Sequence, residues 1–297
     1  YPVRTSPDFK AHQYWDKFYE MHRDKFFKDR KWLFLEFPEL LPLDANSRAT
    51  TRRQGDRQVG IPSPGGSNMD SETSHHQHSG TTHCRPNADC QTAELSAKYI
   101  FYSQVGCGVG NSVFPIVNSI NLANNTVNHT VLNIAYFIFL MKDHPDYDDS
   151  VCHAFVHDIC EEMASFPFPP QSLDVILAVF VLSSIHPERM QRAVNRLSTC
   201  LKHGGIFLFR DYGRYDFSQL RFKKGRCLSE NFYTRGDGTC VYFFTKEEVH
   251  EIFSSAGLEE LQNLEDRRLQ VNRGKKVVMH RVWMQSKYRK SYPPSPS

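Results

Sequence analysis

Apolar runs alternate with segments of helical spacing from about residue 99 to residue 290. Short runs rich in Val, Ile, Leu and Phe predict strands, and apolar residues every three or four positions predict helices. The run at 174–182 is apolar almost throughout, which is typical of a central strand buried on both faces. The predicted strands are residues 100–105, 152–156, 174–182, 206–209 and 277–287. The predicted helices are residues 112–120, 187–201 and 245–257. This alternation predicts a doubly wound, Rossmann-like α/β sheet over residues 99–290.

The flanking regions differ in composition. Residues 1–42 carry aromatic side chains at helical spacing and are predicted to form an N-terminal helical segment. Residues 43–98 are rich in Ser, Thr, Gly, Pro, Asn, Gln and His, cannot bury enough apolar surface, and are predicted to be a disordered linker. Residues 211–244 form a long polar, aromatic and basic interruption of the sheet, and such loops commonly carry function. Residues 291–297 are a Pro- and Ser-rich tail that we expect to be loose.

Composition excludes some classes of protein. The chain has 297 residues, 40% hydrophobic and 23% charged, which is typical of a globular protein rather than a fibrous one. The longest apolar run, residues 131–141, is about half the roughly 20 residues that a membrane-spanning helix needs. The eight cysteines include no C-x-x-C pair, so we expect free thiols, a reducing compartment and no metal site. The net charge is only +3, but the basic residues cluster between 210 and 235 and between 267 and 290, compatible with an RNA partner or a solvated basic face.

A run of alternate glycines follows the first predicted strand of the sheet. Gly106, Gly108 and Gly110 precede a predicted helix, and a strand, a glycine turn and a helix N-terminus together form a nucleotide-type cradle. The spacing is G-x-G-x-G, not the G-x-G-x-x-G of dinucleotide-binding proteins. It is similar to the first motif of methyltransferases that depend on S-adenosylmethionine (SAM). A tight turn without a ligand is the alternative.

Four runs together resemble one family. They are residues 14–19 with 26–30, residues 105–111, residues 180–187, and residues 210–216 with the basic and aromatic stretch that follows to 239. These runs resemble the methyltransferase-like family that makes 3-methylcytidine in the tRNA anticodon loop. Within the family, residues 184–187 and 279–283 are most similar to the branch called protein eight, then to protein two. The first branch would imply a mitochondrial location and the second a cytoplasmic one.

The resemblance implies a seven-stranded SAM-dependent methyltransferase fold, cytidine 32 of tRNA as target, SAM as cofactor, and no metal. By motif, Trp15 and Tyr19 would cover the cofactor, with the glycines at 106, 108 and 110 as its cradle. Asp158 and Ile159 would border the adenine, and Val179 would lie beneath the cofactor. The tRNA anticodon stem-loop is the expected partner. A synthetase or another tRNA-binding protein remains open as a second partner.

The transfer needs little acid or base catalysis, because cytosine N3 keeps a free lone pair at neutral pH when the base is unpaired. The ring gains positive charge as the methyl group arrives, and a nearby carboxylate would stabilise it. We predict Asp211 for this role, with Tyr212 holding the base. The alternative is that Asp211 binds loop amides or pairs with Arg214. The predicted contacts to tRNA phosphates are Arg214, Arg221, Lys223, Lys224 and Arg235. Four further candidates for such contacts could equally be ordinary surface charges: Lys28, Arg30, Arg268 and Arg273.

The chain departs from the family pattern at the second strand. There, SAM enzymes carry an acidic residue that binds the ribose hydroxyls, but no Asp or Glu occurs between Gly106 and Lys142. Gln104 also stands where the family has Glu. The apolar run 131–141 is still able to fill the second-strand position. Two functions therefore remain open: an active tRNA 3-methylcytidine transferase, and a catalytically weak or inactive tRNA-binding protein of the same fold.

Overall fold

The computed structural model describes residues 11–23, 29–41, 100–122, 129–134, 142–274 and 276–293. The predicted linker at 43–98, Lys28 and the last residues of the predicted tail lie outside these ranges.

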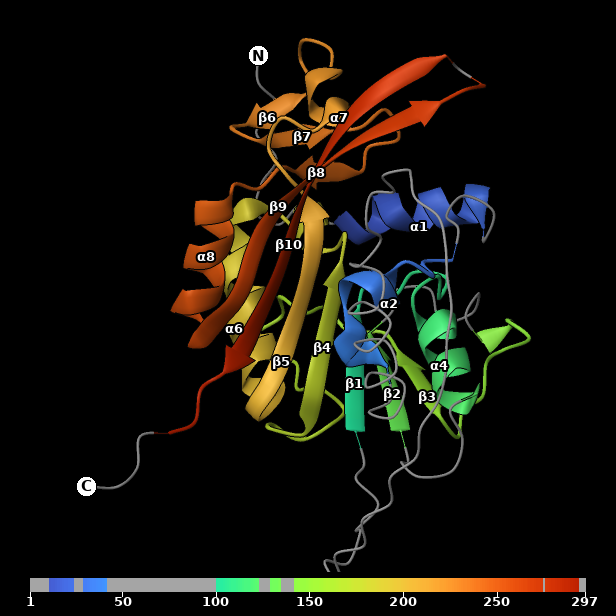
Figure 1. Ribbon diagram of the computed structural model, residues 1–297, viewed down its shortest axis with the longest axis vertical. Coiled ribbons are helices and arrows are strands. Elements are labelled where there is room, and N and C mark those ends of the chain that lie inside the picture. The colour runs from blue at the N-terminus through green and yellow to red at the C-terminus, as the bar shows by residue number, and fades with distance from the viewer. Residues whose placement is uncertain are drawn as a thin grey trace, which may run out of the picture.

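A seven-stranded sheet runs through the centre of the molecule (Figure 1). Its order is β3(Cys152–Phe155), β2(His129–Ile134), β1(Ile100–Val105), β4(Leu173–Val179), β5(Leu201–Tyr212), β10(Val277–Lys290) and β9(Leu258–Asn272). The first five strands pair in parallel, and β10 is antiparallel to both its neighbours. The strand order reverses between β1 and β4, and ligands of such sheets bind where the carboxyl ends of these two strands meet. The predicted fold class is confirmed.

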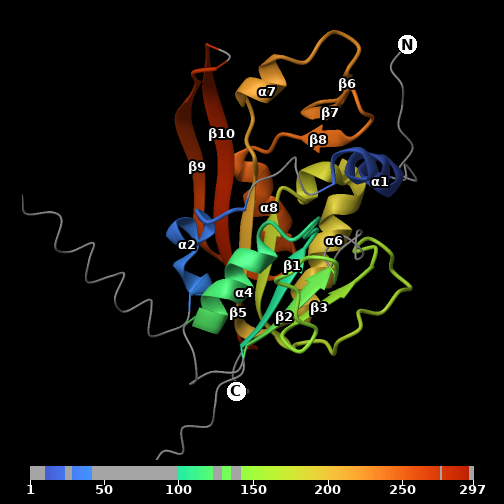
Figure 2. The ribbon, with the colours of Figure 1, turned by 90° about the vertical axis from the view of Figure 1, so that its right-hand side faces the viewer.

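Helices cover both faces of the sheet (Figures 1 and 2). The helices α2(Leu33–Glu36) and α4(Val113–Leu122) pack on one face, and α6(Pro187–Cys200) and α8(Lys246–Ser255) pack on the other. The central strand β4 shows why helices cover both faces: its apolar side chains point alternately to each face. Val175, Leu177 and Val179 point to the first face, whereas Ile176 and Ala178 point to the second. The prediction of a strand buried on both faces is confirmed.

Local signals place the helix starts as the sequence predicts. Pro187 occupies the first turn of α6, where its missing N–H costs nothing, and His186 Nδ1 accepts a hydrogen bond from the Glu188 N–H. Thr245 and Glu248 form a capping box at the start of α8.

The unusual segment after α4 does supply the second strand. β2 pairs in parallel with β1 and with β3, so the apolar run preserves the fold. The strand ends at Ile134, and residues 135–141 lie outside the described ranges.

Two extensions rise beyond the carboxyl ends of the parallel strands (Figures 1 and 2). The predicted substrate loop contains α7(Phe217–Leu220) and a small antiparallel sheet of β6(Cys227–Ser229), β7(Phe232–Thr234) and β8(Cys240–Tyr242). Beside it, the far half of the β9–β10 hairpin extends past the main sheet. The N-terminal α1(Ala11–His22) lies across the same edge, and η1(Pro38–Leu40) follows α2.

Within the described ranges, no helix has the length and apolar character needed to cross a membrane. The cysteines in those ranges are free thiols, and most of them are buried.

Candidate functional site

The glycine turn after β1 has a backbone that favours glycine at three places. The φ angles of Gly106, Gly108 and Gly110 are +60°, +56° and +92°, in the left-handed region that a Cβ disfavours. Each glycine is also approached closely by a different element. A Cβ at Gly106 would lie 2.6 Å from Val181, and one at Gly108 would lie 2.5 Å from the Tyr19 hydroxyl oxygen. The turn is therefore a packed junction where several elements meet.

Helix α1 lies over this turn. Tyr19 contacts Gly108, while Tyr14 packs on Gly238 in the substrate loop, so α1 bridges the two. The Trp15 and Tyr19 rings are 6.1 Å apart, and Phe18 is buried behind them. Burial raises the pKa of Tyr19 to about 12, so its hydroxyl stays neutral and can donate a hydrogen bond. The buried Trp15 Nε1 has no hydrogen-bond partner within the described part of the chain, and a buried donor of this kind favours a ligand that accepts it.

Arg30 is turned inward rather than toward solvent. Its Nη1 donates to Ser112 Oγ (2.8 Å) and its guanidinium carbon lies 5.5 Å from the centre of the Phe180 ring. Burial lowers the pKa of Arg30, although Tyr19, Tyr212 and Asp211 act in the opposite direction. The prediction that Arg30 contacts an RNA phosphate does not fit this orientation, because phosphate contacts need a cation on the surface.

The end of β4 forms the opposite wall. Val179 is buried in the sheet, and Phe180 adopts a left-handed backbone with φ +57°, which is costly for a large side chain. The Phe180 N–H donates to the Arg210 carbonyl oxygen (2.8 Å), which holds this conformation. The Phe180 ring lies 4.9 Å from the Tyr212 ring. Two aromatic side chains thus face each other beside the glycine turn.

Asp211 lies behind Tyr212 and is fully buried. Its carboxylate accepts hydrogen bonds from the Ser183 N–H (3.0 Å) and from the Tyr212 N–H (2.9 Å). Burial raises the pKa of Asp211 to about 6, although hydrogen bonds from Ser183 and Tyr212 and the charge of Arg235 lower it. These contacts correspond to the alternative role, in which Asp211 binds loop amides. The predicted role of Asp211 as a carboxylate that stabilises the developing charge stays a prediction. The structure shows that the carboxylate is fully buried and that it also orders the loop and Tyr212.

Arg235 also differs from its predicted role. Its Nη1 donates to the Cys240 carbonyl oxygen (3.2 Å), and its guanidinium lies 5.8 Å from the centre of the Tyr212 ring. Arg235 closes the β7–β8 turn and backs Tyr212, so it is not free to follow an RNA backbone.

The residues predicted beside the adenine lie after β3. Asp158 is partly exposed, pairs with Arg189 of α6 (3.1 Å) and accepts the Cys160 N–H (2.8 Å). Ile159 is buried in the core against α6. Both are fixed by α6.

The remaining predicted tRNA contacts lie on the surface. Arg214 pairs with Glu230 at 3.3 Å, and Arg221 is exposed over the Phe217 ring. Lys223 and Lys224 are exposed, and their ammonium groups have no acceptor among the described residues. Arg273 is exposed on the β9–β10 hairpin.

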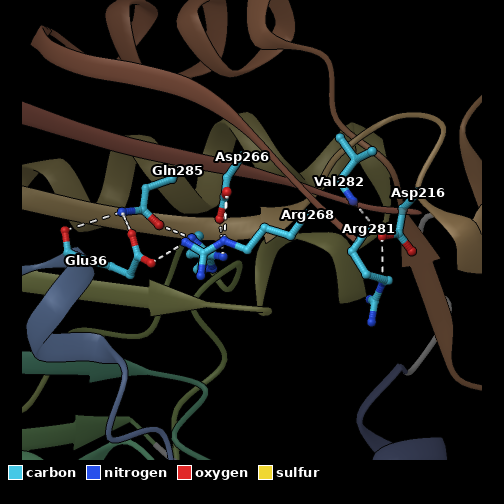
Figure 3. A network of polar contacts seen from close by, with 8 residues as sticks. Glu36, Asp216, Asp266, Arg268, Arg281, Val282 and Gln285 are labelled. Carbon is cyan, nitrogen blue, oxygen red and sulfur yellow. Dashed lines mark hydrogen bonds and ion pairs between the residues drawn. The ribbon is translucent and has the colours of Figure 1, made fainter. Parts of the chain in front are cut away.

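The sequence analysis missed a polar network that ties the N-terminal segment to the sheet (Figure 3). Arg210 is stacked between the rings of Trp32 (4.9 Å) and Trp283 (5.0 Å) and pairs with Asp266 (2.7 Å). Glu36 accepts hydrogen bonds from Gln285 and Arg268. Strand alternation places Arg210 opposite in direction to Asp211, but nothing in the sequence identifies its partners.

Gln104, which the sequence analysis singled out as a departure from the family pattern, is buried near the end of β1. Neither its amide nitrogen nor its amide oxygen has a hydrogen-bond partner among the residues whose side chains the structure describes.

Comparison with known proteins agrees with this geometry. The model of a family described as a methyltransferase domain matches residues 104–263. The chain is 50% identical to zebrafish (Danio rerio) "tRNA N(3)-cytidine methyltransferase METTL2" over 97% of this chain and 76% of the relative. It is 46% identical to human METTL2B over 95% of this chain and 79% of the relative. For the fission yeast (Schizosaccharomyces pombe) trm140 methyltransferase the identity is 35%, over 98% of this chain and 78% of the relative. These animal relatives are named for protein two, the branch that the sequence analysis ranked second after protein eight. The chain therefore belongs to the family of tRNA N(3)-cytidine methyltransferases.

Proposed function

We propose that this chain transfers the methyl group of SAM to N3 of cytidine 32 in the anticodon loop of tRNA. The observation that carries the proposal is the junction at the glycine turn. There, the α1 lid, the Phe180–Tyr212 aromatic pair and the basic substrate loop meet at the carboxyl ends of β1 and β4.

The cofactor would lie on the glycine turn beneath Tyr19 and Trp15. SAM supplies an electrophilic methyl group on a sulfonium. The protein's part is to hold the cytosine N3 in line with that group and to keep water away, for which α1 and the two aromatic rings are suited. An anticodon-loop cytidine is unpaired, so its N3 lone pair is available and the base can enter a pocket.

Asp211 serves this site by positioning Tyr212. Its two hydrogen bonds from backbone N–H groups connect the turn after β4 to the end of β5, the two segments that carry Phe180 and Tyr212. Its negative charge, held in a low-dielectric interior, also favours the positive charge that develops on the methylated ring.

The tRNA backbone would follow the exposed cations of the substrate loop, Arg221, Lys223 and Lys224, and Arg214 after release from Glu230. Such contacts orient the RNA without reading its sequence.

The second candidate is a tRNA-binding protein of the same fold with weak or no catalysis. It is favoured by the absence of an acidic residue between Gly106 and Lys142. Loss of hydrogen bonds to both ribose hydroxyls would cost roughly 2–4 kcal/mol, or about 30- to 1,000-fold in cofactor affinity.

Calorimetric titration of the chain with SAM separates the two candidates. Micromolar affinity supports the enzyme, because the remaining contacts then suffice. Absence of detectable binding, together with retained tRNA binding, supports the second candidate.

A further inference from the structure

The outermost strand of the main sheet, β9, has one edge that no described strand covers (Figure 2). β9 pairs with β10 on one side, and within the described ranges no strand pairs with its other side. The strand is 15 residues long, and residues 267–272 are all exposed. An open edge of this length presents backbone N–H and C=O groups that can pair with a further strand.

The charges along β9 are arranged so that the strand complements itself. Proteins commonly protect an open edge with proline or with charges of one sign, but β9 contains no proline and carries both signs. Glu265 and Arg267 are two residues apart, point to the same face and pair with each other in the single chain. When two copies of β9 run antiparallel and are aligned at Asp266, Glu265 of each copy lies directly opposite Arg267 of the other. This order of charges favours a second copy over an unrelated strand.

The centre of this alignment is also compensated in charge. Asp266 would lie opposite Asp266 of the second copy, but in each chain its carboxylate pairs with Arg210 (2.7 Å) and with Arg268 (2.9 Å). Leu264 and Leu269 are 52% and 60% exposed, and the second strand would cover part of both. The alignment therefore buries apolar surface and leaves no carboxylate at its centre without a cation.

We propose that two copies of this chain associate through antiparallel pairing of their β9 strands, centred on Asp266. The two main sheets then form one continuous sheet. The two-fold axis is perpendicular to this sheet, so the parallel strands of the two copies run in opposite directions. Their carboxyl ends, and with them the two substrate loops, lie at opposite ends of the dimer. The interface therefore leaves both candidate sites open.

The test is a charge exchange followed by analytical ultracentrifugation. The unmodified chain should sediment as a dimer that dissociates on dilution. Glu265→Arg and Arg267→Glu, each made alone, place like charges opposite each other, so each variant should self-associate about tenfold more weakly or less. Mixed in equal amounts, the two variants should form a dimer again, because the arginines of one chain then lie opposite the glutamates of the other.

Arg273→Glu is the matched control, because it makes the same charge change at an exposed residue just beyond the end of β9. It should leave self-association unchanged, and circular dichroism verifies that every variant is folded. The proposal is overturned if the unmodified chain is a monomer at the highest soluble concentration, which would leave the edge to a different protein. It is also overturned if the folded single variants associate as strongly as the unmodified chain, or if their mixture stays monomeric.

Discussion

Arg268 and Arg281 face each other across the β9–β10 hairpin and bind different parts of the molecule (Figure 3). Arg268 pairs with Glu36 of the N-terminal segment, whereas Arg281 Nε pairs with Asp216 of the substrate loop at 2.8 Å. One pair of opposed residues therefore connects both α2 of the N-terminal segment and the substrate loop to the hairpin.

The two ion pairs should differ in strength. Asp216 is fully buried and also accepts the Val282 N–H, whereas Arg268 is about half exposed (48%). Arg281→Met should lower the free energy of unfolding by about 2–4 kcal/mol, because it leaves a buried carboxylate without its cation. Arg268→Met should cost less than about 1 kcal/mol. Urea denaturation measures the free energy of unfolding of both variants. Equal losses of stability would contradict the expected difference between the two ion pairs.

A change at Gly108 should displace the lid. Gly108→Ala places a Cβ 2.5 Å from the Tyr19 hydroxyl at φ +56°, so Tyr19 must move and S-adenosylhomocysteine affinity should fall by roughly tenfold or more. Gly225→Ala is the control: its φ is +83°, but nothing lies within 4 Å of the added Cβ. Both variants should lose about 1–2 kcal/mol of stability from backbone strain. If both variants lost the same S-adenosylhomocysteine affinity, backbone strain would explain the loss, and displacement of Tyr19 would not.

Asp211 should make stability depend on pH. The folded-state pKa of about 6 lies above the ordinary 3.8, so the folded chain binds more protons in this window and loses stability as the pH rises through it. The full penalty, reached above pH 6, is roughly 3 kcal/mol at about 1.4 kcal/mol per pH unit. Asp211→Asn removes this term, so relative to the unmodified chain its free energy of unfolding should improve by roughly 1–2 kcal/mol between pH 5 and pH 7.5. A constant difference between the two chains would show that Asp211 titrates normally.

The same variant tests the positioning role. Asp211→Asn should slow single-turnover methyl transfer, because an amide can accept only one of the two backbone N–H groups that the carboxylate holds. An unchanged rate constant would remove Asp211 from the account of the reaction.

Gln104 offers a stabilising change. Gln104→Leu exchanges a buried amide, which has no partner among the described side chains, for an apolar side chain of similar size. It should raise the free energy of unfolding by about 1–2 kcal/mol. A lower melting temperature for this variant would mean that the amide is paired in solution.

The exposed lysines of the substrate loop should govern the salt dependence of RNA binding. Lys223→Gln with Lys224→Gln should reduce the slope of log K against log salt concentration by about 2, roughly one per phosphate contact. Arg289→Gln is the control, because Arg289 pairs with Glu259 near the opposite end of β10. Equal reductions in both proteins would argue against a specific path along the loop.

Much of the fold can be predicted from the sequence, because strands buried on both faces are largely apolar, as β4 is after Asp174. The same logic shows that the apolar run 131–141 is able to fill the second-strand position, and the structure places β2 at His129–Ile134. β9 escapes this reasoning, since beyond Leu258 only Asn263 is buried and the strand shows no apolar alternation. Pairing with β10 forms this strand, and such long-range contacts leave no local pattern.

The site is only partly readable. The glycine spacing predicts the turn. For Arg30 and Arg235, however, the sequence shows the charge but not whether the side chain points inward or toward solvent. Both are long side chains that turn inward because backbone contacts and aromatic rings at their positions draw them there. Likewise, the sequence leaves open whether the Asp211 carboxylate accepts backbone N–H groups, and only the structure shows that it accepts those of Ser183 and Tyr212.

The most direct test of the central claim is methyl transfer itself. The chain is incubated with isotope-labelled SAM and a tRNA that carries cytidine 32, and the nucleosides are analysed by mass spectrometry beside a matched tRNA with uridine 32. We expect labelled 3-methylcytidine from the first tRNA and none from the second. Binding of the tRNA without transfer of label, or equal labelling of the two tRNAs, would contradict the account.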